Sequence, residues 1–434
     1  MKICWVTPFV LRSSIGRVSA EVAKQLAARG HEVEILRCED QNDPAEPLHP
    51  TALPVHHWRS YDLNRLRTEF DVVVVNIGDN YPFHAGVFAI LDAAPCLGIF
   101  HDFYIYNLFS GWLYYNGLDY QRHDAEIVAT YGPAAQPYAV AVRSGQMLDM
   151  GEIAKHLPMT EWLAGRCEAA LAHAHFYAPK LEAVCLGPVA VTPLCCPDRA
   201  TPPGPPKAKS QLTITTVGVM NPNKRVADVM QALGGSDALK ACVYRLVGPI
   251  SDEERARLEA LAVEVGFDNL VIDGAVDDET LDRRLDEADI MVALRKPVLE
   301  GASGSACEGM LSGRPTVVAR AGFYGELPDD LVFKIDGDIV VDELRSTLER
   351  LVSDDALRRK TGKAARAWAL ETLNAARYAE AVEALAQAQV TSRPLLAVGR
   401  RIGGELKAMG LPAQDPAAAR IGATLQKLFA PLPQ

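Results

Sequence analysis

The sequence predicts an α/β fold with two doubly wound, Rossmann-like parallel sheets. Short apolar segments rich in β-branched residues alternate with amphipathic segments through most of the chain. The alternation stops at a proline-rich stretch, residues 198–210, and then restarts. The chain has 434 residues, 49% apolar and 23% charged, which suits two cores of ordinary size. We therefore expect two sheets facing across a cleft, with ligands beyond the carboxyl ends of the strands.

The first half opens with an apolar strand at residues 3–6 and a helix that ends at Gly30. Three further strands are expected at residues 31–36, 71–76 and 96–100. Several of these segments are apolar on both faces, which is typical of central strands in a parallel sheet. The first segment contains a proline and lacks a small-residue cleavage site after it, so we interpret it as a strand and not as a signal peptide.

The second half repeats this pattern. Strands are expected at residues 212–218, 242–248, 269–274, 289–294 and 315–319, with helices between them and further helices from about 342 to 389. The predicted divisions are an N-terminal Rossmann-like domain, a linker, a C-terminal Rossmann-like domain, a helix returning to the first domain, and a basic tail, at residues 1–199, 200–210, 211–375, 376–392 and 393–434.

The tail differs in charge from the rest of the chain. It holds six bases, Arg393, Arg400, Arg401, Lys407, Arg420 and Lys427, against two acids. Its apolar positions predict two amphipathic helices separated by the sequence GLPAQDP. Two interpretations stand: a solvated packing extension, or a segment that binds a membrane surface or a partner.

Charge, cysteine and histidine content and hydropathy argue against a nucleic-acid-binding, disulfide-bonded, metal-binding or membrane-spanning protein. The net charge of −11 argues against general binding of nucleic acid, which needs clustered Lys and Arg. Nine cysteines without a Cys-x-x-Cys pair indicate reduced thiols in a cytoplasmic protein. Histidines do not cluster at metal-ligand spacing, so no metal site is expected. No apolar run of about 18 residues is present, so we expect no membrane span.

The sequence LEGASGSACEGMLSGRP, residues 299–315, follows a predicted strand with a small-residue loop and a helix. The first-turn amides of a helix have no internal partners and lie at its positive end, so Ser303, Gly304 and Ser305 form a candidate phosphate cradle. Glu308, about one turn inside the helix, could bind a ribose diol. Glu300 precedes the helix, near the reacting end of a ligand. The alternative is a helix with a loose N-cap and two surface acids.

Two other strand-to-helix loops carry candidate anion-binding groups. In VGVMNPNKR, residues 217–225, Lys224 and Arg225 follow a turn and could neutralise a diphosphate. Gly16 begins a helix in the matching loop of the first half and would let backbone approach an anion. The alternatives are an ordinary surface turn and a single uninformative glycine. Without a G-x-G-x-x-G motif, a nicotinamide dinucleotide site is not indicated.

His101 and Asp102 directly follow the strand at residues 96–100, and an aromatic-rich segment comes next. Between residues 102 and 120 lie eight aromatics: Phe103, Tyr104, Tyr106, Phe109, Trp112, Tyr114, Tyr115 and Tyr120. Aromatic rings with polar edges suit sugar rings or a lipid interface. Candidate contacts are Asp102, Tyr104, Tyr106 and Trp112. The alternatives are a packed helical pair and a structural histidine.

Together these motifs resemble the family-four retaining glycosyltransferases, which have the GT-B fold, over about residues 1–390. EGASGSACE is similar to the spaced-glutamate motif of that family. VGVMNPNKR with VADVMQAL resembles the donor loop, SSIGR the glycine-rich acceptor-side loop, IFHD the segment with the active-site histidine, and AGFYGELPD the segment after the glutamate helix.

The resemblance implies roles by position. It implies a catalytic set of His101, Lys224 and Glu300, with His101 contacting the donor sugar, Lys224 the pyrophosphate and Glu300 the reacting centre. It implies a donor-binding set made of Gly16, Gly218, Lys224, Arg225, Ser303, Gly304, Ser305 and Glu308. Asp102, Tyr104, Tyr106 and Trp112 would lie on the acceptor side. No metal or cofactor is implied.

The sequence departs from the family pattern at three places. Val219 stands where the family has arginine, and Arg225 is a candidate to compensate. Ser13 and Ser14 replace glycines. In one variant of the glutamate motif the first acid would fall at Gly301.

The function implied is retaining transfer of a hexose from a nucleotide-diphosphate sugar to a glycan or lipid-linked acceptor. The setting implied is surface polysaccharide assembly in the cytoplasm, with peripheral contact at the inner face of the membrane. Two alternatives remain. One is a catalytically silent homologue that acts as a binding subunit, which Val219 and the serines favour. The other is a sugar-nucleotide epimerase on the same fold.

Overall fold

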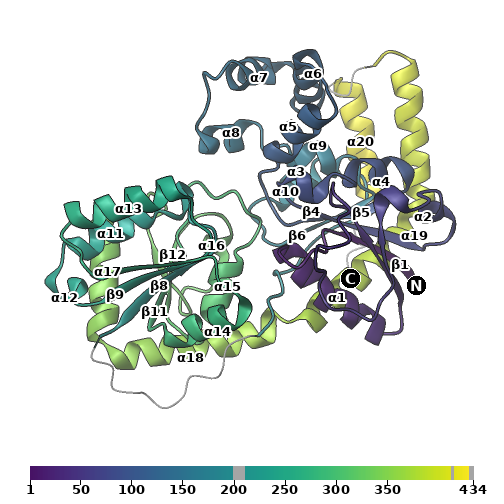
Figure 1. Cartoon of the computed structure of the whole chain (residues 1–434). Coiled ribbons are helices and arrows are strands. Elements are labelled where there is room, and N and C mark those ends of the chain that lie inside the picture. The colour runs from purple at the N-terminus through teal and green to yellow at the C-terminus, as the bar shows by residue number, and fades with distance from the viewer. Residues whose placement is uncertain (199–210, 412–414, 430–434) are drawn as a thin grey trace. The chain divides into compact units, whose positions relative to one another are not determined.

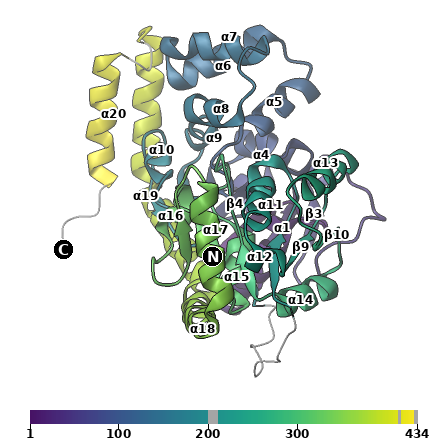
Figure 2. The same cartoon turned by 90° about the vertical axis from the view of Figure 1, so that its left-hand side faces the viewer.

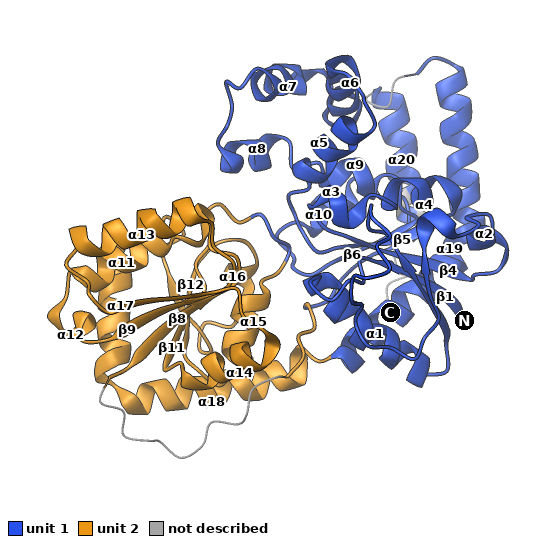
Figure 3. Ribbon diagram, in the orientation of Figure 1, with its two compact units in different colours: residues 1–193, 299–301, 375–434 blue, residues 194–298, 302–374 orange. Residues whose placement is uncertain are grey.

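The computed structural model describes residues 1–198, 211–411 and 415–429. The chain divides into two compact units (Figure 3). Unit 1 comprises residues 1–193, 299–301 and 375–434, and unit 2 comprises residues 194–298 and 302–374. The predicted linker, residues 200–210, lies outside the described residues. Each unit is built on one parallel sheet, which confirms the predicted fold class.

The sheet of unit 1 has seven parallel strands in the order β3-β2-β1-β4-β5-β6-β7. They are β1 (Lys2–Thr7), β2 (Glu32–Arg37), β3 (Val55–His57), β4 (Val72–Ile77), β5 (Cys96–Phe100), β6 (Ala169–Ala172) and β7 (Val189–Val191). Every residue of β4, β5 and β6 is buried, as expected for strands covered on both faces. The strand order reverses between β1 and β4.

Helices of unit 1 connect these strands (Figure 1). Before β5 come α1 (Ser14–Ala28), η1 (Trp58–Ser60), α2 (Arg65–Thr68), α3 (Tyr81–His84) and α4 (Val87–Ala93). The connection from β5 to β6 is long and helical, with α5 (Tyr106–Tyr115), α6 (Tyr120–Tyr131), η2 (Pro133–Ala135), α7 (Gln136–Arg143), α8 (Met150–His156) and α9 (Thr160–Ala164). α10 (Ala178–Glu182) precedes β7.

Two C-terminal helices belong to unit 1. α19 (Ala375–Ala408) packs on α1 and β6, and α20 (Pro416–Phe429) lies beside α19 (Figures 1 and 2). We expected a division between residues 392 and 393, but α19 runs through it and contains Pro394. Proline removes one backbone donor from a helix interior. Here side chains on either side of Pro394 bind Glu168, which holds the helix against the sheet.

The sheet of unit 2 has six parallel strands in the order β10-β9-β8-β11-β12-β13. They are β8 (Thr213–Val217), β9 (Val243–Val247), β10 (Leu270–Gly274), β11 (Ile290–Val292), β12 (Thr316–Ala319) and β13 (Phe333–Ile335). The helices are η3 (Pro222–Lys224), α11 (Val226–Gly234), α12 (Asp237–Lys240), α13 (Asp252–Glu264), α14 (Asp278–Glu287), α15 (Gly304–Leu311), α16 (Gly322–Glu326), α17 (Val341–Ser353) and α18 (Asp355–Thr372). The order reverses between β8 and β11.

Among the helices of the described ranges, none has both the length and the hydropathy needed to cross a membrane.

Candidate functional site

The point where strand order reverses in unit 2 brings two of the predicted motifs together. β8 and β11 are parallel neighbours, so the loops that follow them leave the same edge of the sheet. The amide of Lys296, in the loop after β11, donates a 2.8 Å hydrogen bond to the carbonyl of Asn223, in the loop after β8. Open α/β sheets bind ligands at such an edge. Within unit 2 this edge is the candidate site.

Lys224 lies buried at this edge, with 2% of its surface exposed. Its ammonium donates a hydrogen bond to the carbonyl of Val217, the last residue of β8. Gly218 has φ of +105°, a conformation that glycine adopts at little cost. A Cβ there would lie 3.0 Å from the Lys224 Nζ. The glycine thus lets the ammonium fold back over the strand end, where its charge is shielded from bulk water.

Arg225 has a partner within its own helix. It adopts φ of +56° at the N-cap of α11, and its guanidinium pairs with Asp228 at 2.8 Å. Val219, at the position where the resembled family has arginine, is 58% exposed. The cation that the family's arginine supplies is missing at Val219. Arg225 could replace it only by breaking its ion pair with Asp228.

The N-terminus of α15 follows the loop after β11. The Ser303 hydroxyl caps the helix by accepting a 3.3 Å hydrogen bond from the amide of Ala306. Ser305 is half-buried, and its hydroxyl lies 3.2 Å from that of Ser303. Gly304 is exposed, and a Cβ there would meet no atom of the other described residues within 4 Å. The backbone of the first turn is therefore open to a ligand at Gly304. Glu308 is half-buried in the same helix.

Asn223 adds a polar group that was not predicted. Only 8% of its surface is exposed, and its Oδ1 atom accepts no hydrogen bond from the described residues. A buried acceptor without a partner is costly, so such an atom points to a ligand donor. The sequence Asn-Pro-Asn predicted a turn here, but it did not indicate that the Asn223 side chain would be available to a ligand.

Three predicted residues of unit 1 meet at the end of β5. The backbone of residues 299–301 pairs with the loop after β5: Leu299 accepts from the amides of Phe103 (3.0 Å) and Tyr104 (2.9 Å). Gly301 donates to the His101 carbonyl at 2.9 Å. Asp102 and Glu300 are bridge partners. His101, Asp102 and Glu300 are thus adjacent.

Gly301 has no room for a side chain. A Cβ there would lie 2.5 Å from the hydroxyl oxygen of Tyr177 and 3.0 Å from the carbonyl oxygen of His101. An acid at this position, as in the variant motif, would displace one of these groups.

The His101 ring is buried and bound on both sides. Its Nε2 atom lies 2.9 Å from the Asn76 Oδ1 and its Nδ1 atom 3.2 Å from the His173 Nε2. Burial and the neighbouring His173 and His84 hold the pKa of His101 well below its usual value. The ring is therefore neutral, and it can contact a ligand only by exchanging one of these two partners.

Asp79 is a second residue that sequence reasoning missed. It follows β4, and its amide donates to the Asp102 carboxylate at 2.9 Å. Its own carboxylate accepts from the amides of Asn107 (2.8 Å) and Leu108 (3.1 Å), in the first turn of α5. Burial and the Asp102 charge raise the pKa of Asp79 well above its usual value. An acid two residues after the end of a central strand was the available signal.

Gly16 serves close packing of protein against protein. Its amide donates to the hydroxyl of Ser13, the N-cap of α1, at 3.0 Å. A Cβ at Gly16 would lie 2.5 Å from the Pro8 carbonyl oxygen and 2.9 Å from the His49 ring. The close backbone approach that we expected for an anion is made here by Pro8.

The predicted aromatic contacts separate into two groups. Tyr104 is 2% exposed, and the buried Tyr106 hydroxyl lies 2.7 Å from the His123 Nε2, so both are core residues. Trp112 is half-buried and lines a cavity together with Phe88 and Trp162. Of the four aromatic-segment candidates, Asp102 lies beside Glu300 and Trp112 faces the cavity.

Within the described ranges, no group of three or more His, Cys, Asp or Glu side chains is arranged to hold a metal ion.

Residues 199–368 match the family described as Glycosyl transferases group 1. No curated protein matches the chain in sequence. Solved structures with the same fold include sucrose-phosphate synthase from Thermosynechococcus elongatus, with 15% identity, a TM-score of 0.59, and coverage of 92% of this chain and 100% of that one. WaaG, a glycosyltransferase involved in lipopolysaccharide biosynthesis, has 14% identity, a TM-score of 0.56, and coverage of 87% and 98%.

Anabaena HepE in complex with UDP-glucose has 12% identity, a TM-score of 0.58, and coverage of 89% and 100%. At these identities the likeness shows the fold, which is GT-B.

Proposed function

We propose that the chain is a retaining, metal-independent glycosyltransferase of the family-four type. It moves a hexose from a nucleoside-diphosphate sugar to a glycan or lipid-linked acceptor. The observation that carries this proposal is the edge of unit 2 where β8 and β11 end. A buried ammonium, an amide oxygen that accepts no hydrogen bond from the described residues and an open helix N-terminus lie there. That edge falls inside the segment that matches the glycosyltransferase family, and HepE was solved with UDP-glucose.

The donor would be held by unit 2. The Lys224 ammonium and the amides of Gly304 and Ser305 would bind the diphosphate, because a helix N-terminus and a cation both favour negative charge. The Glu308 carboxylate would accept hydrogen bonds from ribose hydroxyls, with Gly218 shaping the loop. The Oδ1 atom of Asn223 would accept a further hydrogen bond from the bound nucleotide sugar.

Transfer would then proceed by loss of the diphosphate. The bond from the anomeric carbon to the phosphate oxygen breaks, and its electron pair leaves on that oxygen. The acceptor hydroxyl forms the new bond on the same face, and its proton passes to the departing phosphate oxygen. Lys224 and the α15 amides stabilise the charge that grows on the leaving group, which lowers the barrier when such groups are preorganised.

Unit 1 would supply His101, Asp102 and Glu300. The Glu300 carboxylate would stabilise positive charge on the sugar ring in the transition state. Neutral His101 would exchange a protein partner for a sugar hydroxyl. We assign the acceptor to unit 1 and place the enzyme in the cytoplasm, with the basic tail as a candidate contact to the inner face of the membrane.

A catalytically silent homologue is the second candidate. It is favoured by Val219 at the arginine position and by the ion pair that engages Arg225 with Asp228. Such a protein would keep Lys224 and bind the nucleotide without turnover.

A donor screen tests these proposals. The diphosphates of uridine, guanosine, adenosine and thymidine are titrated into the chain by calorimetry, and the sugar conjugates of the best ligand are then assayed for hydrolysis. A transferase binds one diphosphate and hydrolyses a conjugate slowly without an acceptor. Binding without turnover favours the silent homologue, and interconversion of two sugars favours an epimerase. Absence of binding to every diphosphate rejects the proposal.

A further inference from the structure

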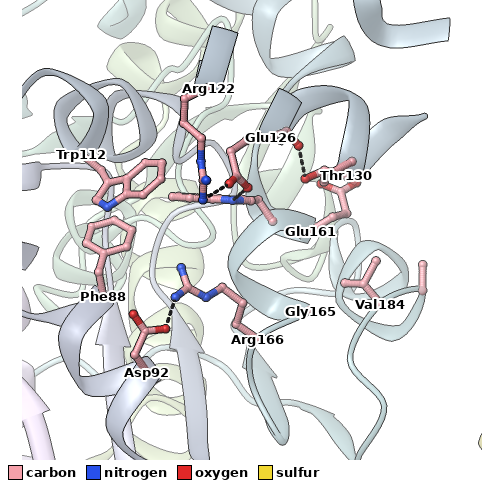
Figure 4. A pocket seen from close by; sticks show the side chains of 13 residues that line it. Phe88, Asp92, Trp112, Arg122, Glu126, Thr130, Glu161, Gly165, Arg166 and Val184 are labelled. Carbon is pink, nitrogen blue, oxygen red and sulfur yellow. Dashed lines mark hydrogen bonds and ion pairs between the residues drawn. The ribbon is translucent and has the colours of Figure 1, made fainter. Parts of the chain in front are cut away.

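The helical region of unit 1 contains a cavity of about 830 Å³ (Figure 4). Its walls come from α4, α5, α6, α9 and the segments that follow α9 and α10. None of its lining residues belongs to the group at the end of β5. Pockets for small organic ligands span about 300 to 1,000 Å³, so this cavity has the size of a ligand site.

One wall of the cavity is aromatic. The rings of Phe88 and Trp112 are stacked, with centroids 5.6 Å apart and planes 28° apart. Trp162 touches both rings, at 5.2 Å from Trp112 and 5.6 Å from Phe88. The face of an aromatic ring is electron-rich, so it attracts the C–H groups on the flat side of a sugar ring. Trp112 is half-buried, and the guanidinium carbon of Arg122 lies 5.7 Å from the centroid of its ring, so the aromatic wall and the charged wall meet at this residue.

The other walls carry paired charges. Arg122 binds Glu126 at 2.6 Å, and the second oxygen of Glu126 accepts from the Trp162 indole at 2.8 Å. Arg166 binds Asp92 at 2.6 Å. Figure 4 shows Arg122 and Arg166 approaching the same space from different walls. A guanidinium has five N–H donors and a carboxylate about four acceptor positions, so each pair has capacity beyond the bond it makes.

This pairing indicates the chemistry of the ligand. A phosphate or nucleotide site needs cations whose charge is not already balanced by carboxylates, and both arginines here have an acid at salt-bridge distance. A lipid chain would leave the carboxylates and guanidiniums without exchangeable partners. A neutral, hydroxyl-rich ring satisfies both walls, because its hydroxyls donate to carboxylates and accept from guanidiniums while its C–H groups pack against Trp112 beside the Arg122 guanidinium.

We infer that this cavity binds neutral hexose units of a glycan. The inference deepens the proposed function, and only the identification of this glycan as the acceptor rests on that function. The acceptor is then a neutral oligosaccharide, one part of which is held by Trp112, Arg122 and their neighbours. Binding itself does not depend on catalysis, so it is measured separately.

The test titrates the full chain with hexaoses of glucose, mannose, galactose and N-acetylglucosamine, followed by calorimetry and tryptophan fluorescence. At least one hexaose is expected to bind with a Kd of about 1 mM or lower. Trp112→Ala should weaken that binding at least about tenfold, because it removes the aromatic face. Tyr114→Ala is the matched control: it lies on the same helix, is 80% exposed and does not line the cavity, so binding should be unchanged.

Arg122→Gln keeps the inference testable if Trp112→Ala fails to fold, since the side chain of Arg122 is 54% exposed and contributes little to the core. It should also weaken binding. Absence of binding to all four hexaoses at about 10 mM would overturn the inference. Binding that survives both variants, or tighter binding of an anionic hexasaccharide, would do the same. Hexaose binding without diphosphate binding would reject the proposed function and leave the cavity assignment standing.

Discussion

A Cβ atom on Gly218 would lie 3.0 Å from the ammonium nitrogen of Lys224. The ammonium donates to Val217, the residue before the glycine. The backbone turn at Gly218 and the position of the lysine charge are therefore coupled: the turn creates the space into which the ammonium folds.

Gly218→Ala should weaken diphosphate binding at least about tenfold, because the new methyl group displaces the ammonium. The same change should cost about 1 to 3 kcal/mol of unfolding free energy, since alanine is strained at φ of +105°. Calorimetry and urea denaturation measure the two effects. Gly403→Ala is the control and should leave binding unchanged, because a Cβ at this position of α19 would meet no other part of the described chain within 4 Å. Equal diphosphate affinity in Gly218→Ala and Gly403→Ala would contradict a role for Gly218 in the donor site.

Glu308→Gln should weaken binding of a nucleoside diphosphate while leaving inorganic pyrophosphate unaffected. The reason is that its carboxylate is proposed to bind ribose, which pyrophosphate lacks. The loss for the nucleotide should be about 1.5 to 3 kcal/mol, the usual contribution of hydrogen bonds to a charged group. Calorimetry with both ligands separates the two contributions. A similar loss for pyrophosphate would place Glu308 at the phosphates instead.

Three buried histidines should make stability depend on pH. Burial lowers the pKa of His84 and of His173 to about 4, and burial with its neighbours lowers that of His101. The unfolded chain, with histidine pKa near 6.5, therefore binds more protons between about pH 6.5 and pH 4. The unfolding free energy should fall as pH falls through this window, by about 1.4 kcal/mol per pH unit for each neutral histidine.

Urea denaturation from pH 7 to pH 4.5 measures this slope. His173→Gln should make the slope shallower, whereas His56→Gln, whose side chain is 44% exposed, should not. Parallel curves for the wild type and His173→Gln would contradict the assignment.

Glu168 should anchor the C-terminal helix. It is 2% exposed and accepts a 3.1 Å hydrogen bond from Gln389 and a 2.5 Å bond from Arg400, both on α19. Glu168→Gln should lower the unfolding free energy by about 2 to 3 kcal/mol, because it removes charge-assisted hydrogen bonds from a buried site. Thermal and urea denaturation test this. Lys407→Gln, in the last turn of α19, is the control. If Glu168→Gln lowered the unfolding free energy no more than Lys407→Gln, Glu168 would not anchor α19.

The strands that sequence analysis found are those with a β-branched, apolar pattern. Residues 71–76 and 96–100 were expected as strands and form β4 and β5. Four strands were not predicted: β3, β7 and β13, which have three residues each, and β6. The sequence of β6 is Ala-Ala-Leu-Ala, which has no β-branched residue and favours helix. Its strand conformation comes from pairing with β5 and β7, which is information that a local pattern does not hold.

The candidate site was predictable where it is local and not where it depends on distant contacts. The N-cap at Ser303 follows from the small-residue loop before the helix. The pairing of residues 299–301 with the loop after His101 joins segments about 200 positions apart and left no local signal. The partners of the two His101 nitrogens left no local signal either, because Asn76 lies in β4 and His173 follows β6.

The most direct test of the central claim is calorimetry of Lys224→Ala against the diphosphate that the wild-type chain binds best. Loss of the buried ammonium should weaken binding at least about a hundredfold, near 2.7 kcal/mol, because no other described lysine lies at the end of β8. Asp228→Asn, which releases Arg225, is expected to retain wild-type affinity or exceed it. Wild-type affinity in Lys224→Ala would contradict the claim that this edge of unit 2 holds the diphosphate of a sugar donor.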